Sequence, residues 1–122
     1  MKTKKIIEKY FEYVNAGKWD DYLGLFADDI VMDEQLMGHI EGKEQLAKGL
    51  EQLKNAKQFR NEPVQIVAER NRAMAVWHIT AMPVEGVNID AKGANYYELE
   101  NGRIKYFSNY HDTAPFAAIM GG

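Results

Sequence analysis

The sequence predicts an α+β fold, because helical patterns come first and strand patterns follow. Residues 4–15 carry apolar side chains at helical spacing, and Gly17 supplies a left-handed stop. In the last third, Asn101 and Gly102 supply the two positive-φ positions of a tight hairpin turn between runs rich in Tyr, Phe and Ile. Helices that precede an antiparallel sheet pack on one of its faces, so we expect a curved sheet covered on one side.

The same periodicities place the other elements. They predict helices at 19–26 and 43–53, a brief buried strand at 30–32, a loop at 35–42, and long strands at 59–68 and 73–82, before a closing hairpin from residue 93. Pro63 cannot donate to a β-ladder, so the strand around it should be an edge or carry a bulge.

Length and composition describe one soluble globular domain that spans residues 1–122. Hydrophobic residues make up 46% and charged residues 27% of the chain, and the absence of cysteine excludes disulfides, thiolate catalysis and Cys-ligated metal sites. The net charge of -3, without clustered Lys and Arg, excludes nucleic acid and anionic membrane as partners. No run approaches the roughly 20 apolar residues of a membrane-spanning helix. We therefore expect a cytoplasmic protein.

The hairpin carries polar side chains on the face that should be buried. Alternation puts Asn95 and Tyr97 on one face of its first strand, and Phe107, Asn109 and His111 on one face of its second. A buried polar group must find a hydrogen-bond partner, so a purely structural sheet seldom carries several. This face is therefore a candidate wall of a functional site.

In strand 73–82, alternation separates Val76 and His78 from Trp77 and Ile79. We expect His78 to face inward, where an imidazole can act as acid, base or donor, although it could equally be a core histidine. Trp77 and Ile79 would then form an outer patch that a monomer would not expose. A homodimer through this outer sheet face would cover them.

Three stretches of the chain resemble the nuclear-transport-factor-2-like superfamily. They are YFEYVNAGKWDDYLGLFADDIVMDE, GHIEGKEQL and ENGRIKYFSNYHD, and the nearest groups are SnoaL-like polyketide cyclases, ketosteroid isomerases and limonene epoxide hydrolases. The resemblance implies a cone-shaped α+β barrel, with three helices cupping a strongly bent, mostly antiparallel sheet around a ligand pocket. It also implies frequent dimers through the outer sheet face.

The resemblance further implies roles for single residues. Tyr10 falls where ketosteroid isomerases keep an oxyanion-hole tyrosine, Glu34 where they keep the aspartate base, and Asn95 near their second oxyanion donor. In the limonene epoxide hydrolase pattern, Asn109 and His78 stand at the positions of two aspartates. Asn95 and Asn109 are amides where active relatives keep carboxylic acids, so the resemblance implies that the proton chemistry lies on Glu34 and His78.

The leading hypothesis is a cofactor-independent isomerase or cyclase that abstracts a proton beside the carbonyl of a hydrophobic substrate. Glu34 would be the base, His78 and Asn109 would position the proton or a water, and Tyr10 would donate to the oxyanion. The alternatives are hydration or hydrolysis by an activated water, and a non-catalytic ligand-binding or dimerisation module. Further residues that could contact the ligand are Met32, Asn95, Tyr97, Phe107, His111 and Asp112.

Several positions keep an alternative interpretation. Asp33 could take the inner position instead of Glu34, and His111 could lie at the rim of the pocket. Asp112 could cap the last turn, and His39 is more often a surface residue than a ligand contact. The three histidines show no H-x-x-x-H spacing, so we predict no metal site.

Overall fold

The structure is a computed structural model that describes residues 2–119. Within these residues, no helix is long and apolar enough to cross a membrane. The elements, in chain order, are α1 (Thr3–Ala16), α2 (Trp19–Leu23), β1 (Phe26–Glu34), β2 (Gly38–Glu41), α3 (Lys43–Gly49), α4 (Glu51–Lys54), β3 (Gln58–Glu69), β4 (Arg72–Met82), β5 (Ile89–Glu100), β6 (Arg103–His111) and the 3-10 helix η1 (Ala114–Ile119).

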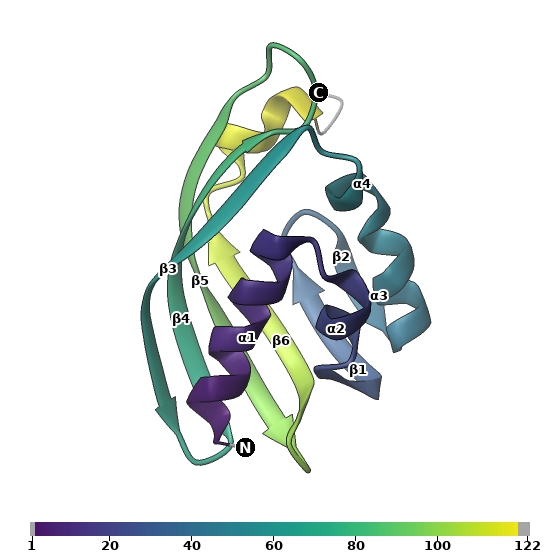
Figure 1. Ribbon diagram of the computed structural model, residues 1–122, viewed down its shortest axis with the longest axis vertical. Coiled ribbons are helices and arrows are strands. Elements are labelled where there is room, and N and C mark those ends of the chain that lie inside the picture. Colours follow the sequence, from purple (N-terminus) through teal and green to yellow (C-terminus); the bar gives the residue numbers. More distant parts are fainter. Residues whose placement is uncertain (1, 120–122) are drawn as a thin grey trace.

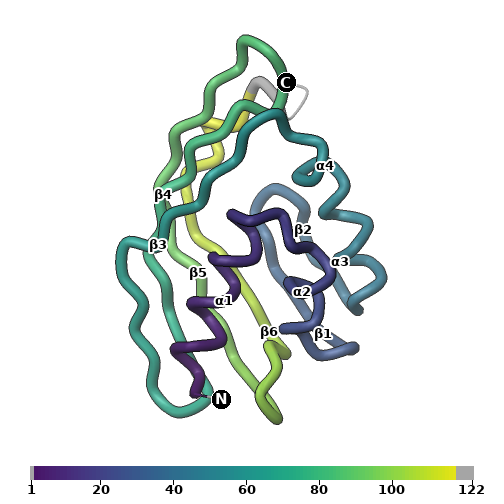
Figure 2. Tube along the Cα trace, in the orientation of Figure 1, coloured from purple at the N-terminus to yellow at the C-terminus, as the bar shows by residue number. Residues whose placement is uncertain are grey.

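Six strands form one mixed sheet in the order β2-β1-β6-β5-β4-β3. β1 pairs with β6 in parallel, and the other neighbours are antiparallel. The helices α1, α2 and α3 lie on one side of the sheet, which we call the inner face (Figure 1). α1 begins beside the turn between β3 and β4, whereas η1 lies at the opposite end of the molecule (Figure 2). The predicted α+β class is therefore confirmed.

The first helix matches its prediction closely. Its buried side chains are Ile6, Ile7, Tyr10, Phe11 and Val14, which recur at helical spacing and face the sheet. Gly17 follows with φ 69°, and its N–H donates to the carbonyl groups at the end of the helix. A residue with a side chain would be strained in this left-handed conformation, so glycine ends the helix here.

The segment from 19 to 53 differs from its prediction. The second helix ends at Leu23, and Phe26 opens β1, which runs to Glu34 rather than covering 30–32 alone. The expected loop 35–42 contains β2, whose Ile40 pairs with Met32 and is 3% exposed. Pairing with β1 makes these few residues a strand, and local sequence does not report such pairing. The third helix is divided into α3 and α4.

The hairpin and the edge strand match their predictions. Asn101 and Gly102 have φ values of 52° and 76°, as a two-residue hairpin turn requires. β3 is an edge strand whose pairing register shifts between Pro63 and Gln65. The missing N–H of proline therefore falls at an irregularity of the ladder.

The prediction for the faces of β4 was wrong. Trp77 is 2% exposed and lies on the inner face, whereas Val76 is 48% exposed on the outer face. Ile79 also packs against the core. Gly93 stands opposite Trp77 in the ladder, and an added Cβ would lie 2.6 Å from the indole Cζ2 atom. The indole therefore occupies the space that a side chain at position 93 would need.

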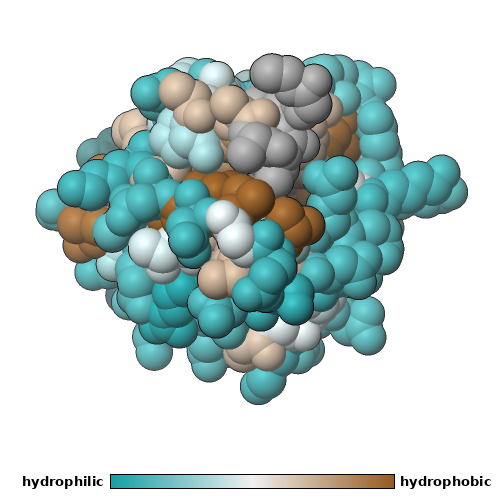
Figure 3. All heavy atoms as spheres, turned by 90° about the horizontal axis from the view of Figure 1, so that it is seen from above, coloured by the Kyte–Doolittle hydropathy of each residue, from teal (hydrophilic) through white to brown (hydrophobic). Residues whose placement is uncertain are grey.

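Viewed from the end of the molecule at the top of Figure 1, the surface is mostly hydrophilic, with a small hydrophobic patch near its centre (Figure 3). The inner face of the sheet is covered by the helices and forms one continuous core. The candidate site lies within this core.

We predict that Gly93→Ala destabilises the fold. The new methyl group would meet Trp77 at 2.6 Å and the Cβ of His111 at 2.7 Å, and overpacking of this kind costs about 1–3 kcal/mol. Urea unfolding of the variant should show this loss of stability. Lys92→Ala, at the exposed neighbouring position, is the matched control and should leave the midpoint nearly unchanged. An unchanged midpoint for Gly93→Ala would contradict the proposed packing.

Candidate functional site

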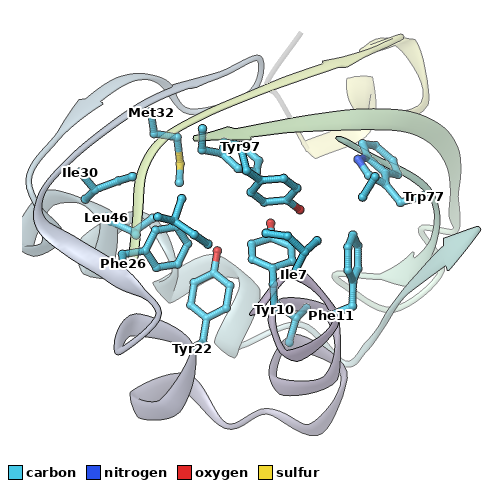
Figure 4. Close-up of a cluster of buried hydrophobic side chains, with 14 of the residues drawn as sticks. Ile7, Tyr10, Phe11, Tyr22, Phe26, Ile30, Met32, Leu46, Trp77 and Tyr97 are labelled. Atoms are coloured by element: carbon cyan, nitrogen blue, oxygen red, sulfur yellow. The ribbon is translucent and has the colours of Figure 1, made fainter. Parts of the chain in front are cut away.

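Three phenol groups meet inside the core. Tyr10 from α1, Tyr22 from α2 and Tyr97 from β5 are 7%, 4% and 0% exposed. The ring centroids of Tyr22 and Tyr97 each lie 5.3 Å from that of Tyr10. Figure 4 shows the three hydroxyl groups pointing toward one another from opposite sides of the core. We call these residues the tyrosine cluster.

An oriented chain of hydrogen bonds leads into this cluster. The indole N–H of Trp77 donates to Asn95 Oδ1 at 2.7 Å, and Asn95 Nδ2 donates to the hydroxyl of Tyr97 at 2.9 Å. Because an indole N–H can only donate, it determines which end of the Asn95 amide carries the oxygen. The amide N–H groups of Asn95 therefore face the tyrosine cluster.

Burial keeps the tyrosine cluster neutral. It raises the pKa of Tyr10 to about 12; hydrogen bonds to Tyr22, Tyr97 and Asn95 oppose this shift, and the charge of Glu34 adds to it. Burial also raises the pKa values of Tyr22 and Tyr97 well above their usual range. At neutral pH all three hydroxyls consequently remain protonated and can donate.

Glu34 lies on the inner face at the end of β1, with a side chain 11% exposed. Its Oε2 accepts two backbone N–H groups, from Leu36 at 2.9 Å and from Met37 at 2.6 Å. Its Oε1 accepts a single hydrogen bond, from Asn109 Nδ2 at 2.9 Å. Oε2 is therefore fully occupied, whereas Oε1 keeps a lone pair for another proton.

His111 is the histidine that lies beside Glu34. Its side chain is 2% exposed, and its Nε2 is 4.0 Å from Glu34 Oε1. The ring packs against Trp77 and Phe116, at centroid distances of 5.4 and 5.3 Å. The structure therefore places this ring in the interior and not at the rim.

The structure brings most of the predicted residues to the inner face. Glu34 is inside, while Asp33 is exposed and bonds to His39 and Tyr106 on the outer face. Both hairpin faces match their prediction. Met32, Asn95, Tyr97, Phe107 and Asn109 are all buried.

His78 is the main correction. It was expected inside, but its side chain is 35% exposed on the outer face and bonds to Asp90 at 2.7 Å. The inner positions of β4 belong to Trp77 and its odd-numbered neighbours, so His78 cannot contact Glu34. Asp112 is likewise exposed, and its Oδ1 accepts the N–H of Ala114, which caps η1.

Three residues of the candidate site were not predicted from the sequence. The hydroxyl of Tyr22 joins the cluster, and Trp77 orients Asn95. The side-chain Oε1 of Gln35 accepts a hydrogen bond from the backbone N–H of His111, and the backbone N–H of Gln35 donates to Asn109 Oδ1. The signal for Trp77 is the glycine opposite it, Gly93. Gln35 carries no sequence signal, because its partners are more than 70 residues away.

Two surface pockets lie elsewhere. One, of about 330 Å³, is lined by residues such as Arg60, Thr80 and Asp90 at one end of β3, β4 and β5. The other, of about 420 Å³, lies between α1, α2 and the hairpin turn. Neither is lined by Glu34 or by the tyrosine cluster. Within residues 2–119, no group of three or more His, Asp or Glu side chains is arranged to hold a metal ion.

Comparison with solved structures defines the class of protein. An NTF2-like protein of unknown function from Burkholderia pseudomallei K96243 superposes with a TM-score of 0.87 at 16% identity, over 100% of both chains. An LEH-like epoxide hydrolase from M. tuberculosis gives 0.81 at 16%, over 95% of this chain and 86% of that one. TerC, co-crystallised with polyporic acid, gives 0.82 at 12%, over 97% of both. The fold is therefore NTF2-like.

The family follows from the sequence itself. The model of the SnoaL-like domain matches residues 7–107, so the chain belongs to the SnoaL-like domain family. Comparison with curated proteins gives no match in sequence. Solved structures with this fold are described as a putative polyketide cyclase, a putative ketosteroid isomerase and an LEH-like epoxide hydrolase, and others as proteins of unknown function. The site must therefore be interpreted from its own residues.

We predict that Tyr10 resists ionisation until the protein unfolds. Its pKa is raised from 10.0 to about 12, so the stability that its neutral form contributes is present below pH 10 and is lost as the pH rises through 12. Ultraviolet titration of the wild type and of Tyr10→Phe should give the same phenolate absorbance up to about pH 11. A phenolate signal near pH 10 that disappears in Tyr10→Phe would contradict the burial.

Proposed function

We propose that this protein is a small-molecule enzyme that removes a proton beside a carbonyl group, leading to isomerisation or cyclisation without a cofactor. The observation that carries this proposal is the carboxylate of Glu34, nearly buried on the inner face beside the neutral tyrosine cluster. A base and a set of neutral donors in one apolar interior are the two parts that enolate chemistry needs.

Glu34 acts as the base through Oε1. Its other oxygen is held by two backbone N–H groups, and Asn109 holds Oε1 itself. These three bonds fix the orientation of the carboxylate and leave one lone pair of Oε1 for the substrate proton. Proton transfer by a positioned group of this kind contributes about 10²–10⁴-fold to a rate.

Tyr10 donates to the oxygen on which negative charge develops. Its pKa of about 12 keeps the hydroxyl protonated at neutral pH, so it donates a hydrogen bond instead of repelling an enolate. Asn95 supplies a second donor, because the Trp77 indole turns its amide N–H groups toward the cluster. Tyr97 and Phe107 contribute apolar ring surface to the same interior.

We infer a hydrophobic small molecule as the ligand, because the side chains around Glu34 and the tyrosine cluster are mostly apolar. TerC, which has the same fold, was co-crystallised with the small molecule polyporic acid. The likeness to an LEH-like epoxide hydrolase supports a second candidate, in which Glu34 activates a water for hydration or hydrolysis. The 4.0 Å between Glu34 Oε1 and His111 Nε2 favours it too, because one water can donate to both atoms. A third candidate is a module that binds ligand without chemistry.

We predict that Glu34→Gln loses base activity and keeps its fold. The ring opening of 5-nitrobenzisoxazole is a suitable probe, because a base removes its C3 proton as the N–O bond breaks and a coloured phenolate forms. We expect kcat/KM to fall at least about 100-fold in Glu34→Gln. Glu41→Gln, an exposed carboxylate in β2, is the control and should keep full activity. Equal activity in wild type and Glu34→Gln would favour the non-catalytic module.

We further propose a homodimer through the outer face of the sheet. Of the expected contacts, Trp77 is buried in the core and the partly buried Ile79 packs against it, so other residues must form the interface. Val67, Met74, Val76 and Tyr110 form an outer apolar patch, and they are 60%, 47%, 48% and 58% exposed. Register places Met74 beside Val67, and Val76 in one row with Ala94 and Tyr110. An apolar surface of this kind favours association with a second copy.

We predict that Val76→Asp converts the dimer to a monomer. A carboxylate at the centre of the outer apolar patch would be desolvated without a partner, which opposes association. Analytical ultracentrifugation should show the wild type as a dimer and the variant as a monomer. Val84→Asp is the matched control, since Val84 is 53% exposed in the turn before β5. A monomeric wild type would contradict this interface.

A further inference from the structure

His111 lies beside Glu34, and the role assigned to it below rests on the proposed function of Glu34 as the base. Several contacts fix the position of its imidazole ring. Trp77 and Phe116 pack against it, and its backbone N–H donates to Gln35 Oε1 at 2.6 Å. An added Cβ on Gly93 would approach the His111 Cβ to 2.7 Å, so this neighbour also requires glycine. The position of the imidazole is therefore fixed from several sides.

A hydrogen bond selects the tautomer of the ring. His111 Nδ1 lies 2.8 Å from the backbone carbonyl oxygen of Asp112, which can only accept. Nδ1 therefore carries the hydrogen, and in the neutral ring Nε2 has a free lone pair. The Nε2 atom lies 4.0 Å from Glu34 Oε1.

Glu34 and neutral His111 thus present two acceptors to each other. A separation of 4.0 Å is too long for a direct hydrogen bond, but a donor on a ligand or a water between them can reach both. Among the described elements that contact the ring, β4, β5 and η1 present Trp77, Gly93 and Phe116, which carry no charge. Glu34 is the charged group that faces His111.

We propose that His111 is the second acid–base residue of the site and takes over the proton that Glu34 removes from the substrate. In the first step the C–H bond breaks, its electron pair forms the enolate, and an O–H bond forms on Glu34 Oε1. In the second step this proton moves through a bridging donor to His111 Nε2, which leaves a carboxylate and an imidazolium. The imidazolium returns a proton to another atom of the enolate, so the net reaction is an isomerisation.

The transfer of the proton from Glu34 to His111 has a physical reason. Oε1 has one lone pair to offer, because Asn109 uses the other. Once protonated, Glu34 must lose its proton before it can act again, and burial restricts transfer to solvent. The hydrogen bond from Nδ1 to the Asp112 carbonyl leaves Nε2 of His111 as a proton acceptor. The ion pair that His111 would form with Glu34 would be shielded from water, because both side chains are nearly buried.

The test uses the 5-nitrobenzisoxazole probe with wild type, Glu34→Gln and His111→Gln. With protein in excess over probe, a single turnover reports proton removal by Glu34. With probe in excess, continued turnover also requires Glu34 to release its proton. We expect His111→Gln to keep the single-turnover rate within about twofold and to lose at least about tenfold in the steady state, as an initial burst followed by slow turnover. Glu34→Gln should lose both phases.

His78→Gln is the matched control, because it makes the same replacement on the outer face. It should leave both phases unchanged. An unaltered steady state in His111→Gln would overturn the proposal, as would the loss of its single turnover while circular dichroism shows a native fold. A wild type that does not open the probe would contradict the proposed function of Glu34.

A second measurement tests His111 without any substrate. Two-dimensional proton–nitrogen NMR of the imidazole identifies which nitrogen carries the hydrogen when the ring is neutral. The proposal requires the Nδ1–H tautomer in the wild type. The Nε2–H tautomer would overturn it whatever the activity, because Nε2 could then no longer accept a proton from Glu34.

Discussion

The interior of this protein depends on one buried hydrogen bond, from the Trp77 indole to Asn95 Oδ1 at 2.7 Å. It joins β4 to β5 on the inner face, and both partners are 2% exposed. A buried polar group without a partner would cost about 1–3 kcal/mol, so the indole and the amide require each other. Their pairing sets the orientation of the amide, and with it the donors that reach the tyrosine cluster.

Burial gives the two halves of the candidate site different properties. The tyrosine cluster is enclosed by apolar rings, so its hydroxyls stay protonated and act as donors. Glu34 lies near the edge of the same core, where three N–H groups satisfy a carboxylate. Neutral donors and a base therefore share one interior because each has partners suited to its own charge.

The most reliable predictions came from short-range patterns. The tight turn at Asn101 and Gly102 needs only two residues of positive φ, so local sequence identifies it. Strict alternation then placed Asn95 and Asn109 correctly on the inner face. In β4 both faces carry apolar side chains, so alternation could not choose between Trp77 and His78. The choice depended on Gly93, which lies on another strand.

The sequence by itself determined the fold class, the helix ending at Gly17 and the closing hairpin. These features follow from periodicity, turn residues and composition, which are local. Only the tertiary structure decided that His111, and not His78, lies beside Glu34, and that Gln35 links the ends of β1 and β6. Such contacts join residues more than 70 positions apart, and side-chain packing across strands, which no local pattern encodes, selects them.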